Sequence, residues 1–201
     1  MTENNEAIER LMGIFKVGVS RSRNMLNAIA GRPIDLEISN VEILSPQELE
    51  EKLTQRFGTI KITLMELVFT GKFQGTVRLI FPQHSAAFII EKMSSEERKQ
   101  LEGRELKKGV ISEVGNILFN GTMGVISTVT EYSITYMVPK YEEGRIKQLF
   151  SSVDVSSYST ALLAKIQVDR GKDLLFCFLV DSLESIIEKS QNLDRYFGNG
   201  S

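Results

Sequence analysis

Apolar positions along this chain follow two different periods, and the order of these periods predicts its secondary structure. Residues 7–30 and 102–127 carry apolar side chains every three or four positions, which predicts two long helices. Apolar and polar residues alternate at 34–38 and 132–138, which predicts half-exposed strands. Four longer apolar runs predict further strands, at 59–69, 75–81, 162–168 and 174–180.

The four longer strands are expected to form two hairpins. Glycines lie in the joint at 71–75, and the joint at 169–173 carries both glycine and aspartate, which tight turns favour. A helix-patterned segment follows each hairpin. Residues 94–103 and 150–160 are expected to be polar connectors, and residues 191–201 a frayed tail.

Two sets of matching segments indicate an internal duplication. The run at 89–92 repeats at 186–189, a spacing of 97 residues. The long helix and the alternating run that follows it repeat at a spacing of 100 residues. We therefore expect an α+β fold with pseudo-twofold symmetry, in which a largely antiparallel sheet is flanked by long helices. It forms a single domain over 1–201, with repeat halves at about 7–97 and 102–192.

Composition agrees with one globular domain. The chain has 201 residues, of which 42% are hydrophobic and 25% are charged, enough for one sizeable core. No apolar stretch approaches the roughly 20 residues that a membrane helix needs. The N-terminal residues are polar and acidic, unlike the basic start of a secretory signal. These features predict a cytoplasmic protein that does not associate with a membrane.

The scarcity of histidine and cysteine excludes several kinds of chemistry. His84 is the one histidine and Cys177 the one cysteine, so the sequence contains neither a multi-histidine metal site nor a disulfide framework. Glycine motifs of the Walker and Rossmann types, which bind phosphate, are absent. We therefore expect the chain to hold no metal or cofactor of its own. Cys177 lies in an apolar run and is expected to be buried.

Charge gives little indication of a partner. The formal net charge of −2 provides no overall attraction for nucleic acid. Basic residues cluster at 16–23 and at 104–108. Both clusters are interpreted as solvated helix faces, and for Lys16, Arg21 and Arg23 a patch that docks a partner protein stays open as the alternative.

Methionines and glycines give predictions about packing. Gly115, Gly121 and Gly124 are expected to permit close helix packing. Six methionines are expected to fill gaps in the core: Met12, Met25, Met65, Met93, Met123 and Met137.

Glu113 and Asn116 are the candidates for chemistry. They stand three residues apart in an apolar, helix-patterned run, so both project to the same side of the helix. The apolar positions around them can face a core, which leaves this pair on the wetter side. Pro139 follows Asn116 by twenty-three residues. It is expected at a strand edge or turn, because proline lacks a backbone donor.

The spacing of these three residues resembles the signature of the CheC/CheX/FliY family of phosphatases, which dephosphorylate chemotaxis response regulators. The family pattern is Asp or Ser, three residues, Glu, two residues, Asn, twenty-two residues and Pro. Glu113, Asn116 and Pro139 match it, whereas Gly109 occupies the position of the Asp or Ser. Together with the repeat layout, the resemblance implies a CheC-like fold and a hydrolase of two-component signalling.

The resemblance also implies roles for both polar residues. Asn116 would orient a water for in-line attack on the aspartyl phosphate of a CheY-like response regulator, and Glu113 would contact a receiver lysine and fix the docking. Phosphoryl transfer requires mainly positioning and charge stabilisation, to which a carboxamide is suited. The Mg²⁺ would belong to the receiver. The identity of that receiver, binding of a CheD-like regulator, formation of a homodimer and control of motility all stay open.

The first half lacks the same pattern. At the spacing of 100 residues, its three positions fall on Gly13, Lys16 and Ser39. Lysine has no acceptor with which to hold a water. We therefore expect one active surface and one relic. Two alternatives stay open: a non-catalytic receiver-binding module of the same fold, and a structural scaffold.

Overall fold

The computed structural model of the chain describes residues 3–93, 103–151 and 157–198. Within these residues, strands form a single seven-stranded sheet: β1 (Glu37–Leu44), β2 (Lys61–Gly71), β3 (Gly75–Phe81), β4 (Ile134–Tyr136), β5 (Lys140–Arg145), β6 (Thr160–Asp169) and β7 (Lys172–Val180). The helices are α1 (Glu3–Ala30), α2 (Pro46–Phe57), α3 (Gln83–Met93), α4 (Gly103–Thr130), α5 (Ile146–Ser151), α6 (Glu184–Lys189) and α7 (Leu193–Phe197). A short 3₁₀ segment, η3 (Ser190–Asn192), joins the last two.

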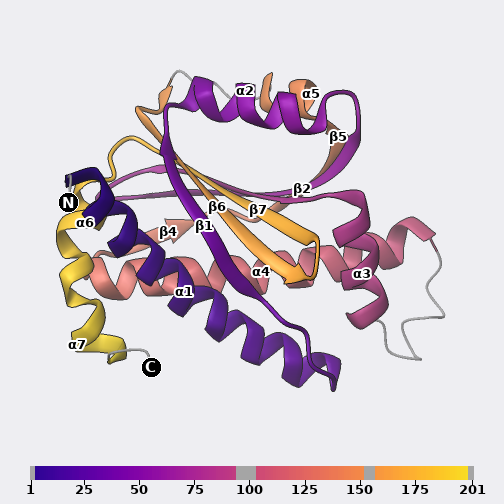
Figure 1. Ribbon diagram of the computed structural model, residues 1–201, viewed down its shortest axis with the longest axis horizontal. Helices are drawn as coiled ribbons and strands as arrows, with labels where there is room; N and C mark the ends of the chain where they lie inside the picture. Colours follow the sequence, from indigo (N-terminus) through magenta and orange to yellow (C-terminus); the bar gives the residue numbers. More distant parts are fainter. Residues whose placement is uncertain (1–2, 94–102, 152–156, 199–201) are drawn as a thin grey trace.

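The sheet lies between two layers of helices. Its paired strands are antiparallel and follow the order β1-β6-β7-β3-β2, with β4 and β5 both paired to the outer edge of β2. Figure 1 shows α1 and α4 along one side of the sheet and α2 and α5 along the other. One buried hydrophobic cluster joins the sheet to α1 and α4, and a second joins it to α2 and α5. The expected α+β fold, with an antiparallel sheet and long helices, is confirmed.

The order of elements repeats along the chain. The run α1-β1-α2-β2-β3-α3 is followed by α4-β4/β5-α5-β6-β7-α6. At the centre of the sheet, Leu79 of β3 lies opposite Phe176 of β7, 97 positions later. Further out, Glu42 of β1 and Glu142 of β5 lie opposite leucines of β6 and β2. A pseudo-twofold axis between β3 and β7 therefore relates the two sets of strands.

Helices α2 and α5 are missing from the prediction, which places a polar connector over 150–160 and no helix on this side of the sheet. The start of α2 is a capping box: Ser45 Oγ accepts from the Glu48 N–H at 3.2 Å, and the Glu48 carboxylate accepts from the Ser45 N–H at 2.7 Å. Its buried residues are spaced four apart: Leu49, Leu53 and Phe57. These signals could have predicted α2, whereas the six residues of α5 are too few for a clear period.

The ends of the shorter elements also differ from the prediction. β1 begins at Glu37, three residues later than predicted, and the Ile34 N–H instead donates to Asn27 Oδ1 at 2.6 Å, next to the end of α1. The expected strand at 132–138 is shortened to β4, and β5, which begins directly after Pro139, is missing from the prediction. Pro139 has no N–H for the ladder and lies between the two strands. The expected frayed tail is wrong for the residues of α7, which pack on α1 and α4. Its last three residues lie outside the described part of the chain. The four longer strands lie within two residues of their predicted ends.

The two long helices cross at small residues. A Cβ on Gly18 of α1 would lie 2.7 Å from the Thr122 Cα, and a Cβ on Gly121 of α4 would lie 2.6 Å from the Gly18 carbonyl oxygen. Ser22 Oγ lies 2.9 Å from the Gly18 carbonyl oxygen and 3.1 Å from that of Ile117, so its hydroxyl also links the helices. The close packing predicted for Gly121 is present, and it depends equally on Gly18.

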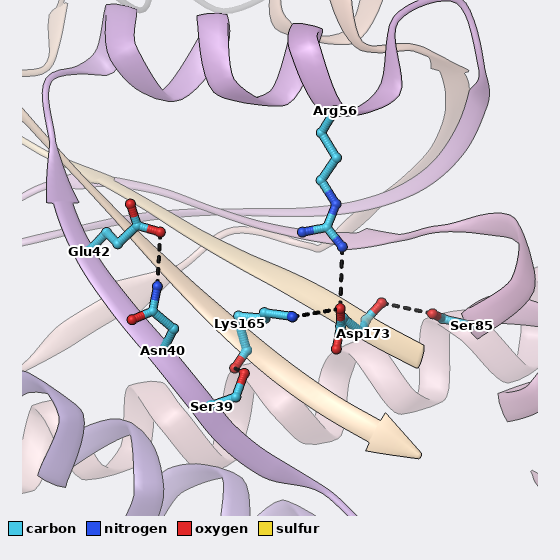
Figure 2. Close-up of polar contacts among 7 residues, drawn as sticks. All are labelled: Ser39, Asn40, Glu42, Arg56, Ser85, Lys165 and Asp173. Carbon is cyan, nitrogen blue, oxygen red and sulfur yellow. Dashed lines mark hydrogen bonds and ion pairs between the residues drawn. The ribbon is translucent and has the colours of Figure 1, made fainter. Parts of the chain in front are cut away.

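A polar cluster at the start of β7 connects four elements (Figure 2). Asp173 Oδ2 lies 3.3 Å from Arg56 Nη2 of α2 and 3.0 Å from Lys165 Nζ of β6. The Asp173 carbonyl oxygen accepts from Ser85 Oγ of α3 at 2.8 Å. Only 14% of the Asp173 side chain is exposed, so water screens these pairs less than ordinary surface pairs. The cluster fixes α2 and α3 to the same end of the sheet.

Replacing Gly18 by Ala is expected to lower the free energy of unfolding by about 1–3 kcal/mol, because the added methyl group meets the backbone of Thr122. Gly124 is the matched control, since a Cβ there has no neighbour within 4 Å. The prediction that Gly124 permits close helix packing is therefore wrong. Gly124→Ala is expected to raise the free energy of unfolding by about 1 kcal/mol through helix propensity. Urea unfolding followed by circular dichroism measures both. Equal stability of the two variants would contradict the close crossing.

Candidate functional site

Asn116 lies on the solvent-facing side of α4. Gly109, Asn116 and Asn120 are exposed and Glu113 is half-buried. The opposite side of the helix is buried along most of its length, and it includes Val110, Ile111, Val114, Leu118 and Val125. The helix is therefore held rigidly by its apolar side. Glu113 and Asn116 project to the outer side, as their spacing predicts.

The sheet brings the segment around Pro139 to this part of α4. A Cβ on Gly115 would lie 2.8 Å from Met65 Cγ, so α4 rests on β2 at this point. Met65 is opposite Tyr141 of β5, and Tyr141 packs against the same hydrophobic cluster as α4. Pro139 precedes Tyr141 by two residues along the chain. Pro139 is thus at the sheet edge, in the connection between β4 and β5, as predicted.

Three consecutive apolar residues are exposed just before Pro139. The exposed fractions are 41% for Tyr136, 61% for Met137 and 85% for Val138. We call these three residues the edge ridge. Single exposed apolar residues are ordinary, whereas three in succession are a candidate for a contact with a partner. The expectation that Met137 fills a core gap is wrong, and Met25, at 57% exposure, is a second error of the same kind.

A polar contact fixes α4 against β5. Lys107 Nζ lies 2.7 Å from Glu143 Oε1, and the Tyr141 hydroxyl donates to the same oxygen at 2.6 Å. The Lys107 ammonium and the Tyr141 hydroxyl hold the pKa of Glu143 below its usual value. Burial, followed by the bond to Glu143, raises the pKa of Tyr141. Sequence reasoning missed this contact, because nothing in the local pattern pairs residues that far apart.

The corresponding place in the first half differs in its chemistry. Lys16 and Ser39 are exposed, in the positions that the repeat relates to Asn116 and Pro139. A Cβ on Gly13 would lie 2.9 Å from Leu193 Cδ2, so α7 lies close to the position related to Glu113. Neither a carboxylate nor a carboxamide of the predicted pattern is present here.

The described residues provide neither a cluster of metal ligands nor a membrane-spanning helix. No group of three or more histidine, cysteine, aspartate or glutamate side chains within 3–93, 103–151 and 157–198 could hold a metal ion. None of the helices in this part of the chain is long and apolar enough to cross a membrane. Cys177 is fully buried as expected, and burial raises the pKa of its thiol to about 12.

Comparison with known proteins identifies the fold. No protein-family model matches the sequence, and neither does any curated protein. FliY from Thermotoga maritima has a TM-score of 0.67 at 16% identity, covering 97% of this chain and 99% of its own. The FliM middle domain from H. pylori has a TM-score of 0.58 at 14% identity, covering 94% and 99%. The chemotaxis protein CheX from Desulfovibrio desulfuricans has a TM-score of 0.56 at 13% identity, covering 83% and 98%.

The chain therefore has the fold shared by FliY, CheX and the FliM middle domain, and the expected likeness to the CheC/CheX/FliY fold is confirmed. At these identities the likeness establishes the fold. The roles of Glu113 and Asn116 stay predictions.

The contact between Lys107 and Glu143 predicts a pH dependence of stability. A carboxylate whose pKa is lowered by folding stabilises the protein above its unfolded pKa, and this contribution is lost as the pH falls through the folded pKa. Glu143→Gln should therefore reduce the free energy of unfolding at neutral pH, and the difference from wild type should shrink in acid. Urea unfolding at about pH 7 and about pH 3 measures this difference. A difference that is independent of pH would contradict the assignment. Glu91→Gln, at an exposed helix position, is the control.

Proposed function

We propose that this chain hydrolyses the aspartyl phosphate of a chemotaxis-type, CheY-like response regulator, with Asn116 positioning the water and Glu113 docking the receiver. The observation that carries the proposal is the exposed Asn116 on a rigid helix, one turn from Glu113 and on the part of α4 that packs on β2 beside β5. The fold shared with CheX and FliY supports it. This function makes the chain a hydrolase of two-component signalling.

The proposed reaction requires positioning rather than a reactive side chain. A water oxygen bonds to phosphorus as the bond from phosphorus to the aspartate oxygen breaks, which leaves a free carboxylate and inorganic phosphate. The Asn116 carboxamide can accept a hydrogen bond from the water through Oδ1 and donate one through Nδ2. Holding the water in line removes part of the entropic cost of the reaction. Mg²⁺ comes from the receiver, and the chain needs no cofactor of its own.

The edge ridge provides a docking contact in the same proposal. An aspartyl phosphate lies within the receiver's own active site, so Asn116 must be inserted into it. Tyr136, Met137 and Val138 can bury apolar area against the receiver surface during this insertion. The Lys107–Glu143 contact holds α4 and β5 together, so that Asn116 and the ridge meet the partner as one rigid surface.

A non-catalytic receiver-binding module is the second candidate. Gly109 lacks the side chain that the family pattern has at this position. Complexes of FliM with FliG and with SpeE from H. pylori are examples of this fold bound to other proteins. A CheD-like regulator, a homodimer and a cytoplasmic location remain expectations for either function.

Asn116→Ala is expected to slow dephosphorylation of a CheY-like receiver by about 100-fold, because the water loses its positioning group. Asn120→Ala is the matched control, since Asn120 is also exposed, one turn further along α4. The measurement is the decay of the phosphorylated receiver, with Mg²⁺, in the presence of each variant. If Asn116→Ala accelerated the decay of the phosphorylated receiver as much as the wild-type protein does, the role assigned to Asn116 would be excluded. Binding without acceleration, across a panel of receivers, would select the binding module instead.

Gly109→Ser restores a residue type of the family pattern. A Cβ at this position has no neighbour within 4 Å, so the variant should fold, with a free energy of unfolding about 0.5 kcal/mol higher than wild type. We expect it to increase the rate of dephosphorylation. A stable variant with the wild-type rate would show that the first position of the pattern does not contribute in this chain.

A further inference from the structure

A hollow of about 380 Å³ lies between α1 and β1, in the half of the chain that lacks the predicted active residues. We call it the α1–β1 groove. Its residues come from one side of the helix and from the start of the strand: Lys16, Val19, Ser20, Arg23, Leu36, Glu37 and Ile38. A volume of this size is at the lower end of those that hold a ligand or a few side chains.

The groove occupies the place that the internal repeat relates to the candidate site. At the repeat spacing of 100 residues, Lys16 corresponds to Asn116, and residues 36–38 correspond to the edge ridge. The chemistry of the two places is opposite. The second half presents a carboxamide and exposed apolar side chains, whereas the first half presents cations above a largely buried apolar floor, in which Val19 is 1% and Leu36 3% exposed.

Positive charge is concentrated around the groove. Between residues 11 and 34 the chain has four basic side chains and no carboxylate, although its overall net charge is −2. Lys16 and Arg23 line the groove itself. Arg23 Nη1 lies 3.7 Å from Asp35 Oδ1, but the Asp35 side chain is 74% exposed, so this pair holds Arg23 only weakly. Glu37 is the one carboxylate that lines the groove.

From this arrangement we propose that the α1–β1 groove docks an acidic segment of a partner protein. Carboxylates of that segment pair with Lys16 and Arg23, and the Ser20 hydroxyl can donate a further hydrogen bond. An aliphatic side chain of the segment contacts Val19 and Ile38 on the floor. The groove therefore gives the chain a second binding surface, which works independently of Asn116 and of the proposed phosphatase activity.

The probe is a fluorescein-labelled peptide of aspartate, glutamate and leucine residues, and its binding is followed by fluorescence anisotropy. Charge reversal by Lys16→Glu with Arg23→Glu is expected to weaken binding at least about tenfold. Lys61→Glu with Arg145→Glu is the matched control, because it makes the same change of charge at exposed positions on the opposite edge of the sheet. This control should bind like wild type.

Glu37→Lys gives the complementary test, because it removes the carboxylate that faces the ligand and should strengthen binding several-fold. Damage to the fold could not produce such a gain. Asn116→Ala should leave peptide binding unchanged, whether or not it lowers the phosphatase activity.

Equal losses of peptide binding in both charge-reversal pairs would overturn the proposal by showing only general charge attraction. Absence of peptide binding would also overturn it, as would groove-dependent binding to phosphatidylglycerol vesicles alone, which would indicate a membrane-facing surface.

Discussion

The close crossing of α1 and α4 is the contact on which the rest of the structure depends. Gly18 and Gly121 allow the two backbones to approach to a distance at which a side chain on either would meet main-chain atoms. At this separation both helices lie on the same side of the sheet and bury their apolar sides in one cluster. The same packing turns the opposite side of α4 outward, so the exposure of Asn116 is a consequence of the helix crossing.

The internal repeat keeps a common backbone while its two halves differ in chemistry. Near the pseudo-twofold axis, Leu79 and Phe176 are paired apolar residues, and both halves need them for the core. On the outer surfaces of the helices and at the sheet edges, solvent tolerates many side chains. There one half has Lys16 beside a basic groove, and the other has Asn116 and the edge ridge. The packing constraint thus falls on the centre of the sheet and leaves the two outer surfaces free to diverge.

The second side of the sheet also breaks the symmetry. Arg78 of β3 is fully buried, and its Nε and Nη2 donate to Glu66 Oε2 at 2.9 and 2.7 Å. Its guanidinium lies over the ring of Phe150 at 4.4 Å. At the repeat spacing of 97, Leu175 takes the place of Arg78. A buried ion pair adds little net stability because both groups lose hydration, so its clearest effect is on the orientation of the elements around it.

The sequence by itself determined the long helices, the four longer strands, the repeat and the side of α4 on which Glu113 and Asn116 lie. These are local properties, since the period of apolar residues reports which side of an element is buried. Tertiary structure alone decided the edge ridge, the contact of Glu143 with Lys107 and the approach of Leu193 to Gly13. Each of these depends on which distant segments meet. That is set by the helix crossing and the strand register, which no local pattern records.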